Sequence, residues 1–499
     1  MNAMSETPAI LLVHPDDSVV IAMAPIPAGT QLMVGEETLL VTQDIPQGHK
    51  IARYAVRTGD PVLRYGFPFG VATTTIQPGD HVHSHNVHTA LSTGNAYRYS
   101  MPDKASEDRG QERHFQGYVR PDGSVGTRNE IWIIPTVGCV GRTAERLAAQ
   151  ASRTLPPGID GIHAFPHPFG CSQLSDDLEG TTGILAALAQ HPNAGGVLLL
   201  GLGCESNQMA LMLEHIPPER RARIRMLGAQ ASVDEMEEGL AAITELAAIA
   251  GQDRRQPAPL SALRLGVKCG GSDGLSGLTA NPLIGRMADA IGKAGGRVLL
   301  TEIPEIFGAE QILMDRCVDE QTFDALVDLV CGFKDYFVAH GEPVSENPSP
   351  GNIRGGITTL EEKSLGAVQK AGHVPVTDVL PYAGRASRAG LTVLEGPGND
   401  AVSTTALAAA GATVTLFSTG RGTPLGSPIP TVKIASNSAL ATAKPGWIDF
   451  DAGTVLNKGM DAAAEDLLDT VIAIASGKAA RNEINEERSI AIWKRGVTL

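Results

Sequence analysis

From residue 117 to the C-terminus the chain repeats one unit: a short apolar run, a Gly-rich polar loop and a segment with helical spacing. Residues 130–137, 196–201 and 263–267 are the clearest of the apolar runs. Such runs, bounded by turn residues, are typical of buried strands. Strands that alternate with helices form parallel sheets with crossover helices. The pattern therefore predicts an α/β fold with largely parallel sheets.

The chain before residue 100 has a different pattern, in which many short strand-like runs are separated by Pro- and Gly-containing turns. This predicts a small β-rich domain. A chain of 499 residues is also too long for one ordinary domain. We therefore expect a β domain over 9–100, a linker over 101–116, an α/β domain over 117–250, a linker over 251–260 and a C-terminal α/β domain over 261–499.

The formal net charge of −15 argues against a nucleic-acid-binding surface. No run approaches 18 apolar residues, and the N-terminus lacks the basic and apolar regions of a signal peptide. We therefore expect a cytoplasmic protein that binds a small molecule and neither nucleic acid nor membrane. A homo-oligomer is compatible with the sequence.

Six cysteines are scattered along the chain without a CxxC pair, which argues against a zinc knuckle and against a disulfide framework. Cys317 and Cys331 lie in helix-like contexts and are expected to be core thiols. The others follow or precede glycine in polar loops: Cys139, Cys171, Cys204 and Cys269. Each alone is explained as a small buried thiol. Together they point to a reduced pocket that is associated with a metal.

Residues 268–277 form the most Gly-rich of these loops, with four glycines in ten positions, and they follow the apolar run 263–267. A loop of this kind can be a tight turn without a ligand. It can also present N–H groups, the Ser272 hydroxyl and the Asp273 carboxylate to an anion. Because ligands of open α/β sheets bind at the carboxyl ends of strands, we expect a site there.

Histidines alternate near the end of the β-rich region, at positions 81, 83 and 85. On a strand this spacing places all three imidazoles on one face, as expected of a metal-binding or anion-facing surface. The simpler alternative is an exposed polar strand face. His49 and Lys50 add a second basic pair nearby in the sequence.

Several catalytic motifs are missing. The sequence has no Walker A motif and no Gly-x-Ser-x-Gly elbow, and the run from Gly201 lacks the third glycine of a dinucleotide-binding loop. The loops are instead rich in hydroxyl, amide and cationic side chains. Such a pocket suits a small polyhydroxylated carboxylate, and a divalent metal would stabilise the enediolate that forms when the α-proton leaves.

The motifs together resemble those of the altronate/galactarate dehydratase family. They include Thr127-Arg-Asn, Gly170-Cys-Ser-Gln-Leu, Gly201-Leu-Gly-Cys-Glu, Cys269-Gly-Gly-Ser-Asp-Gly, Thr301-Glu-Ile-Pro-Glu, Asn347-Pro-Ser-Pro-Gly-Asn, Gly398-Asn-Asp and Ser418-Thr-Gly-Arg-Gly-Thr-Pro. The resemblance covers residues 9–499. It implies an N-terminal SAF domain, which is a β-clip, and a lyase that removes water from a sugar acid. The run that begins at Gln173 points to altronate more than to galactarate, and so to 2-keto-3-deoxy-D-gluconate as the product in hexuronate catabolism.

The resemblance also implies Fe(II) or Mn(II) as the cofactor, with His83, His85 and Glu305 as the hypothetical ligands. Proton transfer is assigned to a group of four residues, namely His49, Lys50, Lys363 and Glu302. Substrate contacts are assigned to Arg128, Asn129, Ser272, Asp273, Asn399, Asp400, Arg421 and Thr423. Lys268 stands where relatives have other residues, so it is a weaker candidate for catalysis.

Three alternatives stay open at this point. The same chemistry could act on galactarate or another sugar acid, because a few pocket contacts decide between such substrates. A non-catalytic sugar-acid sensor would need neither a metal nor a base. An iron–sulfur dehydratase would need Cys139, Cys171 and Cys204 to converge on one cluster, which a sequence cannot show.

Overall fold

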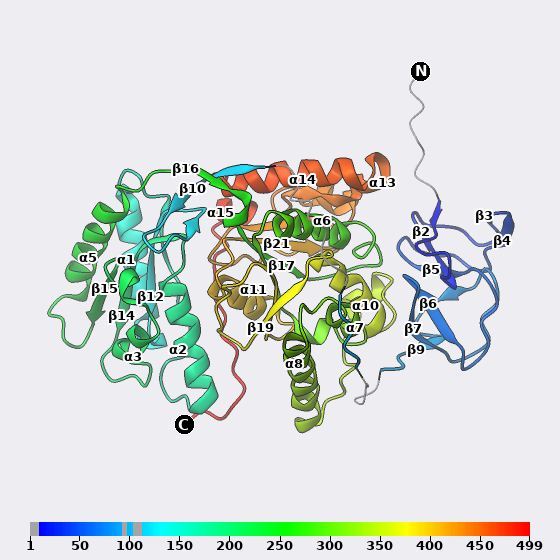
Figure 1. Ribbon diagram of the computed structural model, residues 1–499, viewed down its shortest axis with the longest axis horizontal. Helices are drawn as coiled ribbons and strands as arrows, with labels where there is room; N and C mark the ends of the chain where they lie inside the picture. The colour runs from blue at the N-terminus through cyan, green and yellow to red at the C-terminus, as the bar shows by residue number, and fades with distance from the viewer. Residues whose placement is uncertain (1–8, 92–96, 103–111) are drawn as a thin grey trace, which may run out of the picture.

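The computed structural model describes residues 9–91, 97–102 and 112–499. Figure 1 shows three parts side by side, with the C-terminal domain in the middle, the N-terminal β domain at one end and a smaller α/β domain at the other. The predicted combination of a small β domain with two α/β parts that contain parallel sheets is confirmed. No helix among the described residues has both the length and the apolar character needed to cross a bilayer.

The N-terminal domain is built of short antiparallel strands. A four-stranded sheet has the order β1-β2-β5-β8 and a three-stranded sheet the order β6-β7-β9, while β3 and β4 form a hairpin. The bounds are Ile10–Leu11 (β1), Val19–Ala22 (β2), Gln31–Val34 (β3), Glu37–Leu40 (β4), Lys50–Ala52 (β5), Pro61–Arg64 (β6), Phe67–Ala72 (β7), His81–Val82 (β8) and Val87–His88 (β9). Strand β5 begins at Lys50, directly after His49.

One prediction for this domain is wrong. The alternating histidines do not share a strand, because β8 ends at Val82. The chain turns there: the Asn86 side chain accepts a hydrogen bond from His83 N (2.9 Å), and Asn86 N donates to His83 O (2.9 Å). An Asn side chain that bonds to nearby backbone favours a turn over a strand. The turn nevertheless keeps the rings of His81 and His85 together, with 5.4 Å between their centroids.

The smaller α/β domain has a four-stranded parallel sheet of order β13-β12-β14-β15. Residues of β12 alternate between its faces, since Ile131 and Ile133 join one apolar cluster and Trp132 and Ile134 join another. The bounds are Glu130–Pro135 (β12), Gly161–Ala164 (β13), Ala194–Gly201 (β14) and Ile224–Gly228 (β15), with helices Gly141–Ala151 (α1), Ser175–Ala189 (α2), Met209–Glu214 (α3), Pro218–Arg221 (α4) and Glu235–Ala250 (α5).

Helices α1 and α5 cover one face of this sheet, and α2 covers the other. Residues 184–189 of α2 are all buried, which is typical of a helix enclosed on every side. The reason is that α2 also packs against α11 of the C-terminal domain. The two α/β domains therefore share one apolar layer.

The two predicted linkers contain strands. Strand β10 (His114–Val119) pairs with β16 (Gln256–Pro259) and with β11 (Val125–Gly126) in an antiparallel sheet. These strands pair with residues far away in the sequence, so the local pattern of polar, Pro-containing residues does not predict them. The second half of the 251–260 segment is therefore paired with the strand that precedes the smaller α/β domain, and it is not a free linker.

The C-terminal domain holds a seven-stranded parallel sheet of order β19-β20-β18-β17-β21-β22-β23. The chain moves from β17 to one side first and later returns to place β21 on the other side. The crevice beside β17 and β21 is thus the topological switch point, where open α/β sheets bind ligands. The strands are Arg264–Cys269 (β17), Arg297–Leu300 (β18), Val376–Leu380 (β19), Gly390–Leu394 (β20), Val414–Thr419 (β21), Thr431–Ala435 (β22) and Phe450–Asp451 (β23).

Helices lie on both sides of this sheet, with α6 above it and α11 below it in Figure 1. Their bounds are Ala280–Lys293 (α6), Glu310–Met314 (α7), Glu320–Ala339 (α8), Pro350–Arg354 (α9), Leu360–Ala367 (α10), Asp400–Ala409 (α11), Ser438–Ala443 (α12), Val455–Lys458 (α13), Met460–Ala475 (α14) and Arg481–Ile484 (α15). Single 3-10 turns occur at 138–140, 152–154, 260–262, 303–305, 368–371 and 452–454. Helix α10 contacts β7 of the N-terminal domain.

Candidate active site

A group of buried charges lies at the carboxyl ends of β17 and β18. Glu302 follows β18 with φ of 68°, the left-handed region that a non-glycine residue seldom adopts. This conformation is held by the side chain, because Glu302 Oε2 accepts from Cys269 N (3.0 Å) and lies 3.2 Å from Lys370 Nζ. Backbone strain of this kind persists only where surrounding contacts over-determine it, and it is concentrated at functional sites.

Two lysines contact Glu302 and Cys269. Lys370 Nζ lies 2.8 Å from Cys269 Sγ, and Lys268 Nζ lies 3.1 Å from Glu302 Oε1 and 2.5 Å from Asp400 Oδ1. All except Asp400 are buried. Because a buried charge without a partner is very costly, these groups are stable only as a set.

Glu305 joins the same set through its two oxygens. Its Oε2 lies 3.2 Å from Cys269 Sγ, and its Oε1 accepts from Lys363 Nζ at 2.8 Å. Lys363 Nζ also donates to Asn347 Oδ1 at 3.1 Å. We call Lys268, Cys269, Glu302, Glu305, Lys363 and Lys370 the buried charge cluster.

The pKa values in this cluster are shifted by burial and by its own charges. Burial raises the pKa of the Cys269 thiol to about 12, against the lowering effect of Lys370, so the thiol is protonated at neutral pH. Burial alone would raise the pKa of Glu305, but the neighbouring Lys363 and Lys370 lower it below its usual value. The carboxylate of Glu305 is therefore ionised, and it holds Lys363 as an ammonium, whose pKa is raised despite burial.

Histidines of the N-terminal domain form a second group. His49 Nδ1 and His81 Nε2 are 2.9 Å apart, and the ring centroid of His83 lies 5.0 Å from that of His49 and 5.4 Å from that of His81. Burial is the main cause that lowers the pKa of His81 to about 3 and of His83 to about 4. The imidazoles are thus neutral at physiological pH, which leaves nitrogen lone pairs for a metal or a proton.

These histidines face the C-terminal domain. His83 Nδ1 is 3.0 Å from Thr358 Oγ1, and His49 Nε2 is 3.5 Å from Arg354 O. The loop 355–358 lies just before α10, whose Lys363 belongs to the buried charge cluster. The histidine group and the buried charge cluster are therefore both in contact with the short segment 354–363.

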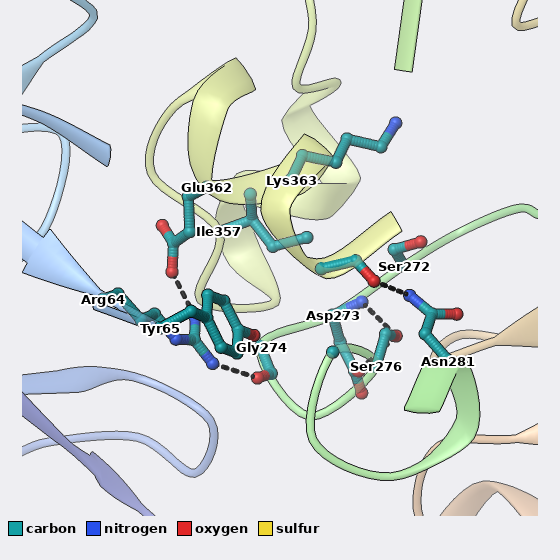
Figure 2. A pocket seen from close by; sticks show the side chains of 12 residues that line it. Arg64, Tyr65, Ser272, Asp273, Gly274, Ser276, Asn281, Ile357, Glu362 and Lys363 are labelled. Atoms are coloured by element: carbon teal, nitrogen blue, oxygen red, sulfur yellow. Dashed lines mark hydrogen bonds and ion pairs between the residues drawn. The ribbon is translucent and has the colours of Figure 1, made fainter. Parts of the chain in front are cut away.

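A buried ion-pair network fixes this docking. Glu362 on α10 pairs with Arg64, and its Oε1 lies 2.9 Å from Lys50 Nζ. Lys50 Nζ donates to Gly356 O (2.6 Å), and Arg64 donates to Gly274 O (2.9 Å), as Figure 2 shows for Arg64. Burial opposes the charge of Glu362, yet Lys50 and Arg64 together lower its pKa to about 2. Burial lowers the pKa of Lys50 to about 8.

Two cavities border these groups. The one in Figure 2 has a volume of about 10 Å³ and is lined by Arg64, Ser272, Asp273 and Lys363 among others, so it holds at most one water molecule. The second has a volume of about 570 Å³, within the size range of ligand pockets. Asn347 and Gly398 line it, and these residues adjoin Lys363 and Glu305.

All parts of the chain match one family. Residues 8–90 match the altronate/galactarate dehydratase SAF domain, residues 117–251 match the second domain of D-galactarate dehydratase/altronate hydrolase, and residues 260–498 match the C-terminal domain of D-galactarate/altronate dehydratase. The chain is 48% identical to an altronate dehydratase of Escherichia coli K12, over 98% of this chain and 99% of the relative. The chain belongs to the altronate/galactarate dehydratase family.

Two further relatives support this placement. An altronate dehydratase of Bacillus subtilis 168 is 46% identical over 98% of this chain and 100% of the relative. A galactarate dehydratase (L-threo-forming) of Escherichia coli K12 is 31% identical over 95% of this chain and 94% of the relative. This dehydratase chain is thus a hydro-lyase by family, with both sugar-acid activities represented among its relatives.

The structure brings some of the predicted site residues together. His49 and His83 meet in the histidine group, and Glu302, Glu305 and Lys363 meet in the buried charge cluster. Asp400 reaches the cluster through Lys268, which sequence reasoning had ranked as a weak candidate. The predicted ligand set is divided, however, since His83 and Glu305 share no contact among those found in the described residues.

Other predicted substrate-binding residues have structural partners. Asp273 accepts from Ser436 Oγ (2.9 Å) and from Asn437 Nδ2 (3.1 Å). Asn399 caps α11, because its Oδ1 accepts from Ala401 N and Val402 N. Ser272 holds Asn352 through its carbonyl oxygen. These residues shape the loops that surround the site.

Arg421 and Thr423 follow β21 on the rim of the site. Arg421 is exposed and donates to Gly351 O (3.3 Å), and Thr423 Oγ1 accepts from Leu425 N (3.2 Å). Arg421 thus keeps donors that a carboxylate could reach. Thr423 is bound to its own turn.

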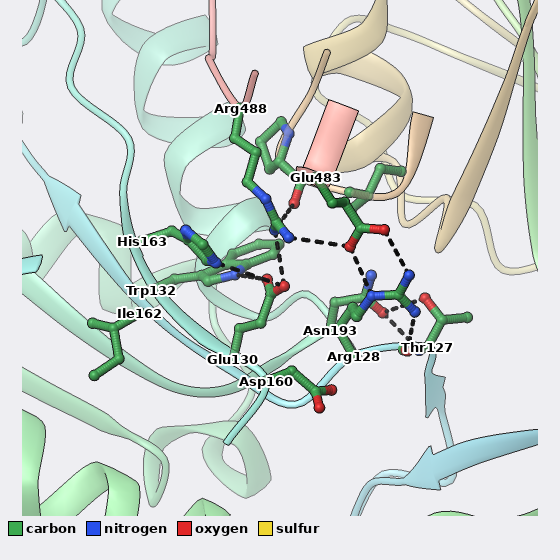
Figure 3. Close-up of polar contacts among 12 residues, drawn as sticks. Thr127, Arg128, Glu130, Trp132, Asp160, Ile162, His163, Asn193, Glu483 and Arg488 are labelled. Atoms are coloured by element: carbon green, nitrogen blue, oxygen red, sulfur yellow. Dashed lines mark hydrogen bonds and ion pairs between the residues drawn. The ribbon is translucent and has the colours of Figure 1, made fainter. Parts of the chain in front are cut away.

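Arg128 and Asn129 lie outside this site, and their donors are in use. Arg128 makes two bonds to Glu483 (both 2.7 Å) and donates to the carbonyls of Thr127, Ile474 and Lys478, which occupies all five of its N–H groups. Figure 3 shows Arg128 against Glu483, with Arg488 and Glu130 beside them. Asn129 likewise bonds to Arg120, Gly158 and Ala250. Arg128 joins the two α/β domains and Asn129 bonds within the smaller one, so a role of either residue in holding substrate has no geometric support.

Sequence reasoning missed three residues of this region. Lys370 and Glu362 gave no signal, because a single charge on a helical segment reads as surface. Cys269 was noted as a loop thiol, whereas it ends β17 and lies in the buried charge cluster. Only the fold, which brings residues 100 positions apart together, identifies them.

The buried charge cluster contains three potential metal ligands. Among the described residues, Cys269, Glu302 and Glu305 have ligand atoms that all lie within 4.8 Å of one another. Three ammonium groups already contact this set, so a cation there would have to displace them. The neutral imidazoles of His81 and His83, for which the described residues show no direct contact with a carboxylate or an ammonium, suit a divalent transition metal better.

Proposed function

We propose that this chain removes water from D-altronate to give 2-keto-3-deoxy-D-gluconate, in the cytoplasm. The observation that supports this most is the match to altronate dehydratases over nearly the whole chain, at 46–48% identity. The site also has the chemistry that this reaction needs: a proton acceptor that is neutral at physiological pH, and cations for a carboxylate.

In this proposal His81, His83 and His85 hold the metal, with Fe(II) or Mn(II) as the candidates. When bound, the metal would stabilise the negative charge of the enediolate. His49 has a pKa lowered by burial and by Lys50, so its imidazole can accept the proton from C2. Lys363 is held as an ammonium by Glu305 and can donate a hydrogen bond to the departing C3 hydroxyl.

Substrate recognition is assigned to the rim. Arg421 binds the carboxylate, and Asn347 with the neighbouring loop residues binds hydroxyls. The larger cavity provides the route to the site, since two of its lining residues adjoin Lys363 and Glu305. Turnover of galactarate is the second candidate, because a relative of that activity is 31% identical over most of the chain.

The test is a metal-reconstituted assay. Chelator-treated protein is supplied with Fe(II), Mn(II) or Mg(II) under reducing conditions and given altronate, galactarate, gluconate or mannonate, with 2-keto-3-deoxy acid as the readout. We expect turnover of altronate, restored by Fe(II) or Mn(II), and its loss in His83→Ala.

His88→Ala is the matched control, because His88 is an exposed histidine of the same segment. Turnover by His83→Ala at the wild-type rate would refute the metal assignment. Binding of altronate without turnover, unaffected by chelator, would support a sensor and overturn the proposed catalysis.

A further inference from the structure

Three cysteines follow three neighbouring strands of the smaller α/β domain. Cys139 follows β12, Cys171 follows β13 and Cys204 follows β14, and β12 lies between the other two in the sheet. Because the strands are parallel, all three loops leave the same edge. The proposed dehydration uses none of these residues.

The loops that carry the cysteines are joined to one another. Gly138 N donates to Phe169 O (2.8 Å), Asn207 N donates to Gly170 O (3.0 Å), and Asn207 Nδ2 donates to Thr136 O (3.0 Å). Gly170 has φ of 100°, and a Cβ there would lie 2.1 Å from Thr136 O. Each loop that carries a cysteine is thus hydrogen-bonded to a loop that carries another, so the fold holds all three in one region.

The thiols themselves are turned outward. Cys139, Cys171 and Cys204 are free and exposed, whereas Cys269 and Cys317 are buried. Their side-chain contacts are weak: Cys171 Sγ is 3.8 Å from Ser172 Oγ, and Cys204 Sγ is 3.7 Å from Gln230 Nε2. Packing therefore does not account for these thiols, and exposed thiols are a liability unless they bind something.

The Glu205 carboxylate in this region is turned inward. Glu205 accepts from Thr136 Oγ1 (2.7 Å), Leu202 N (3.1 Å) and Gly203 N (2.5 Å), so it pins the Cys204 loop rather than offering a ligand. It is buried. The thiols are then the ligand atoms that this edge presents, on loops with fixed backbones.

The spacing of the thiols decides the kind of ligand. A tetrahedral ion with metal–sulfur bonds of about 2.3 Å brings its sulfurs to about 3.8 Å from one another. Among the described residues, the group with ligand atoms within 4.8 Å of one another is Cys269, Glu302 and Glu305, and the three loop cysteines do not form such a group. The three sulfurs therefore do not form a ligand set for one tetrahedral ion. A cluster of several irons and sulfides holds its cysteine sulfurs farther apart than a single ion does.

We propose that Cys139, Cys171 and Cys204 bind a cubane iron–sulfur cluster, in which the fourth iron has no cysteine ligand. The cluster would be in addition to the divalent metal of the proposed active site. This proposal does not rest on the proposed function. The cluster is detected by its iron content, its sulfide content and its absorption spectrum, and not by turnover.

The test starts with full-length protein purified or reconstituted without oxygen, using Fe(II) and sulfide. We expect about four irons and four acid-labile sulfides per chain, with broad visible absorption that bleaches on reduction. Cys139→Ser, Cys171→Ser and Cys204→Ser, singly and together, should lose most of the sulfide and absorption. Cys331→Ser, in α8, is the matched control and should keep both.

Folding is checked in each variant by circular dichroism and by the thermal midpoint, which exposed Cys→Ser changes should leave within about 1 °C. Iron without sulfide, zinc in place of iron, or absorption that persists in the triple variant would each overturn the cluster. If the wild-type protein has its full sulfide content but does not turn over altronate, the proposed function is wrong and the cluster stands.

Discussion

The buried charge cluster shows how single residues set the chemistry of this site. Lys268, Lys363 and Lys370 face Glu302 and Glu305, and nearly all of their side-chain surface is buried. Replacing an ammonium and its carboxylate partner together would be tolerated, whereas replacing only one of them leaves an uncompensated charge in the interior. The cluster therefore constrains each of its members more tightly than a surface ion pair would.

Lys370→Met tests this constraint. Glu302 would keep its charge with one ammonium fewer, and we expect a loss of about 3–5 kcal/mol in the free energy of unfolding. Urea unfolding followed by fluorescence measures it. Lys458→Met, at a partly exposed pair with Asp466, is the matched control and should cost about 1 kcal/mol or less. Equal losses in both variants would contradict the balance described for the cluster.

Glu362 makes a prediction about pH. Its pKa in the folded chain is about 2, against 4.5 for an unperturbed glutamate. A depressed pKa contributes stability above pH 4.5, and this contribution is lost as the pH falls from 4.5 towards 2. The stability of wild type relative to Glu362→Gln should therefore fall over this window, by an amount on the order of 3 kcal/mol.

The matched control for that experiment is Glu245→Gln, since Glu245 pairs with Arg225 at the surface. Its pH profile of the thermal midpoint should follow the wild type. A Glu362→Gln profile parallel to the wild type would show that Glu362 is not held ionised by Lys50 and Arg64.

At the scale of elements, short segments at the C-terminus join the two α/β domains. Glu483 in α15 pairs with Arg128, and Arg488 beyond it pairs with Glu130 (2.8 Å) and Glu483 (3.1 Å). Helix α15 has only four residues, so its own hydrogen bonds would not stabilise it. These ion pairs, which are largely buried, hold it in place between the domains (Figure 3).

Arg128→Met should therefore act on stability and not on substrate binding. We expect the free energy of unfolding to fall by several kcal/mol, because Glu483 loses its bidentate partner, while KM for altronate stays within about twofold. Arg142→Met, at an exposed pair with Glu145, is the matched control. A large rise in KM with unchanged stability would restore the role of Arg128 in substrate binding.

For the whole molecule, the candidate active site depends on how closely the N-terminal domain docks. Gly274 and Gly48 meet at the interface, and a Cβ on Gly274 would lie 2.0 Å from Gly48 O. No atom there is the end of a flexible side chain. The histidine group reaches the C-terminal domain only because two backbones can touch at this point.

Gly274→Ala should separate the domains locally. We expect hydrogen exchange to increase in β5 and α10, and altronate turnover to fall at least tenfold, with the parallel sheets still protected. Gly446→Ala is the matched control, because a Cβ there meets no atom within 4 Å. Wild-type exchange in β5 of Gly274→Ala would contradict the close docking.

Local sequence patterns specify the classes of structure and the family resemblance. Apolar runs followed by Gly-rich loops fixed β12, β14 and β17 as buried parallel strands, because periodicity and turn residues act locally. The same local signals placed the cysteine loops at strand ends. Local patterns of this kind do not depend on how the domains are arranged.

Which charged residues act together depends on the tertiary structure. Lys50 and Glu362 are 312 positions apart, and their pairing depends on the docking of two domains. Arg128 and Lys370 show the same limit. Arg128 lies in a motif that resembles the family's and makes a structural ion pair, whereas Lys370 lies in no such motif and belongs to the buried charge cluster. The physical reason is that the cost of a buried charge is met by whichever partner the fold brings near, and nothing in the local sequence records that partner.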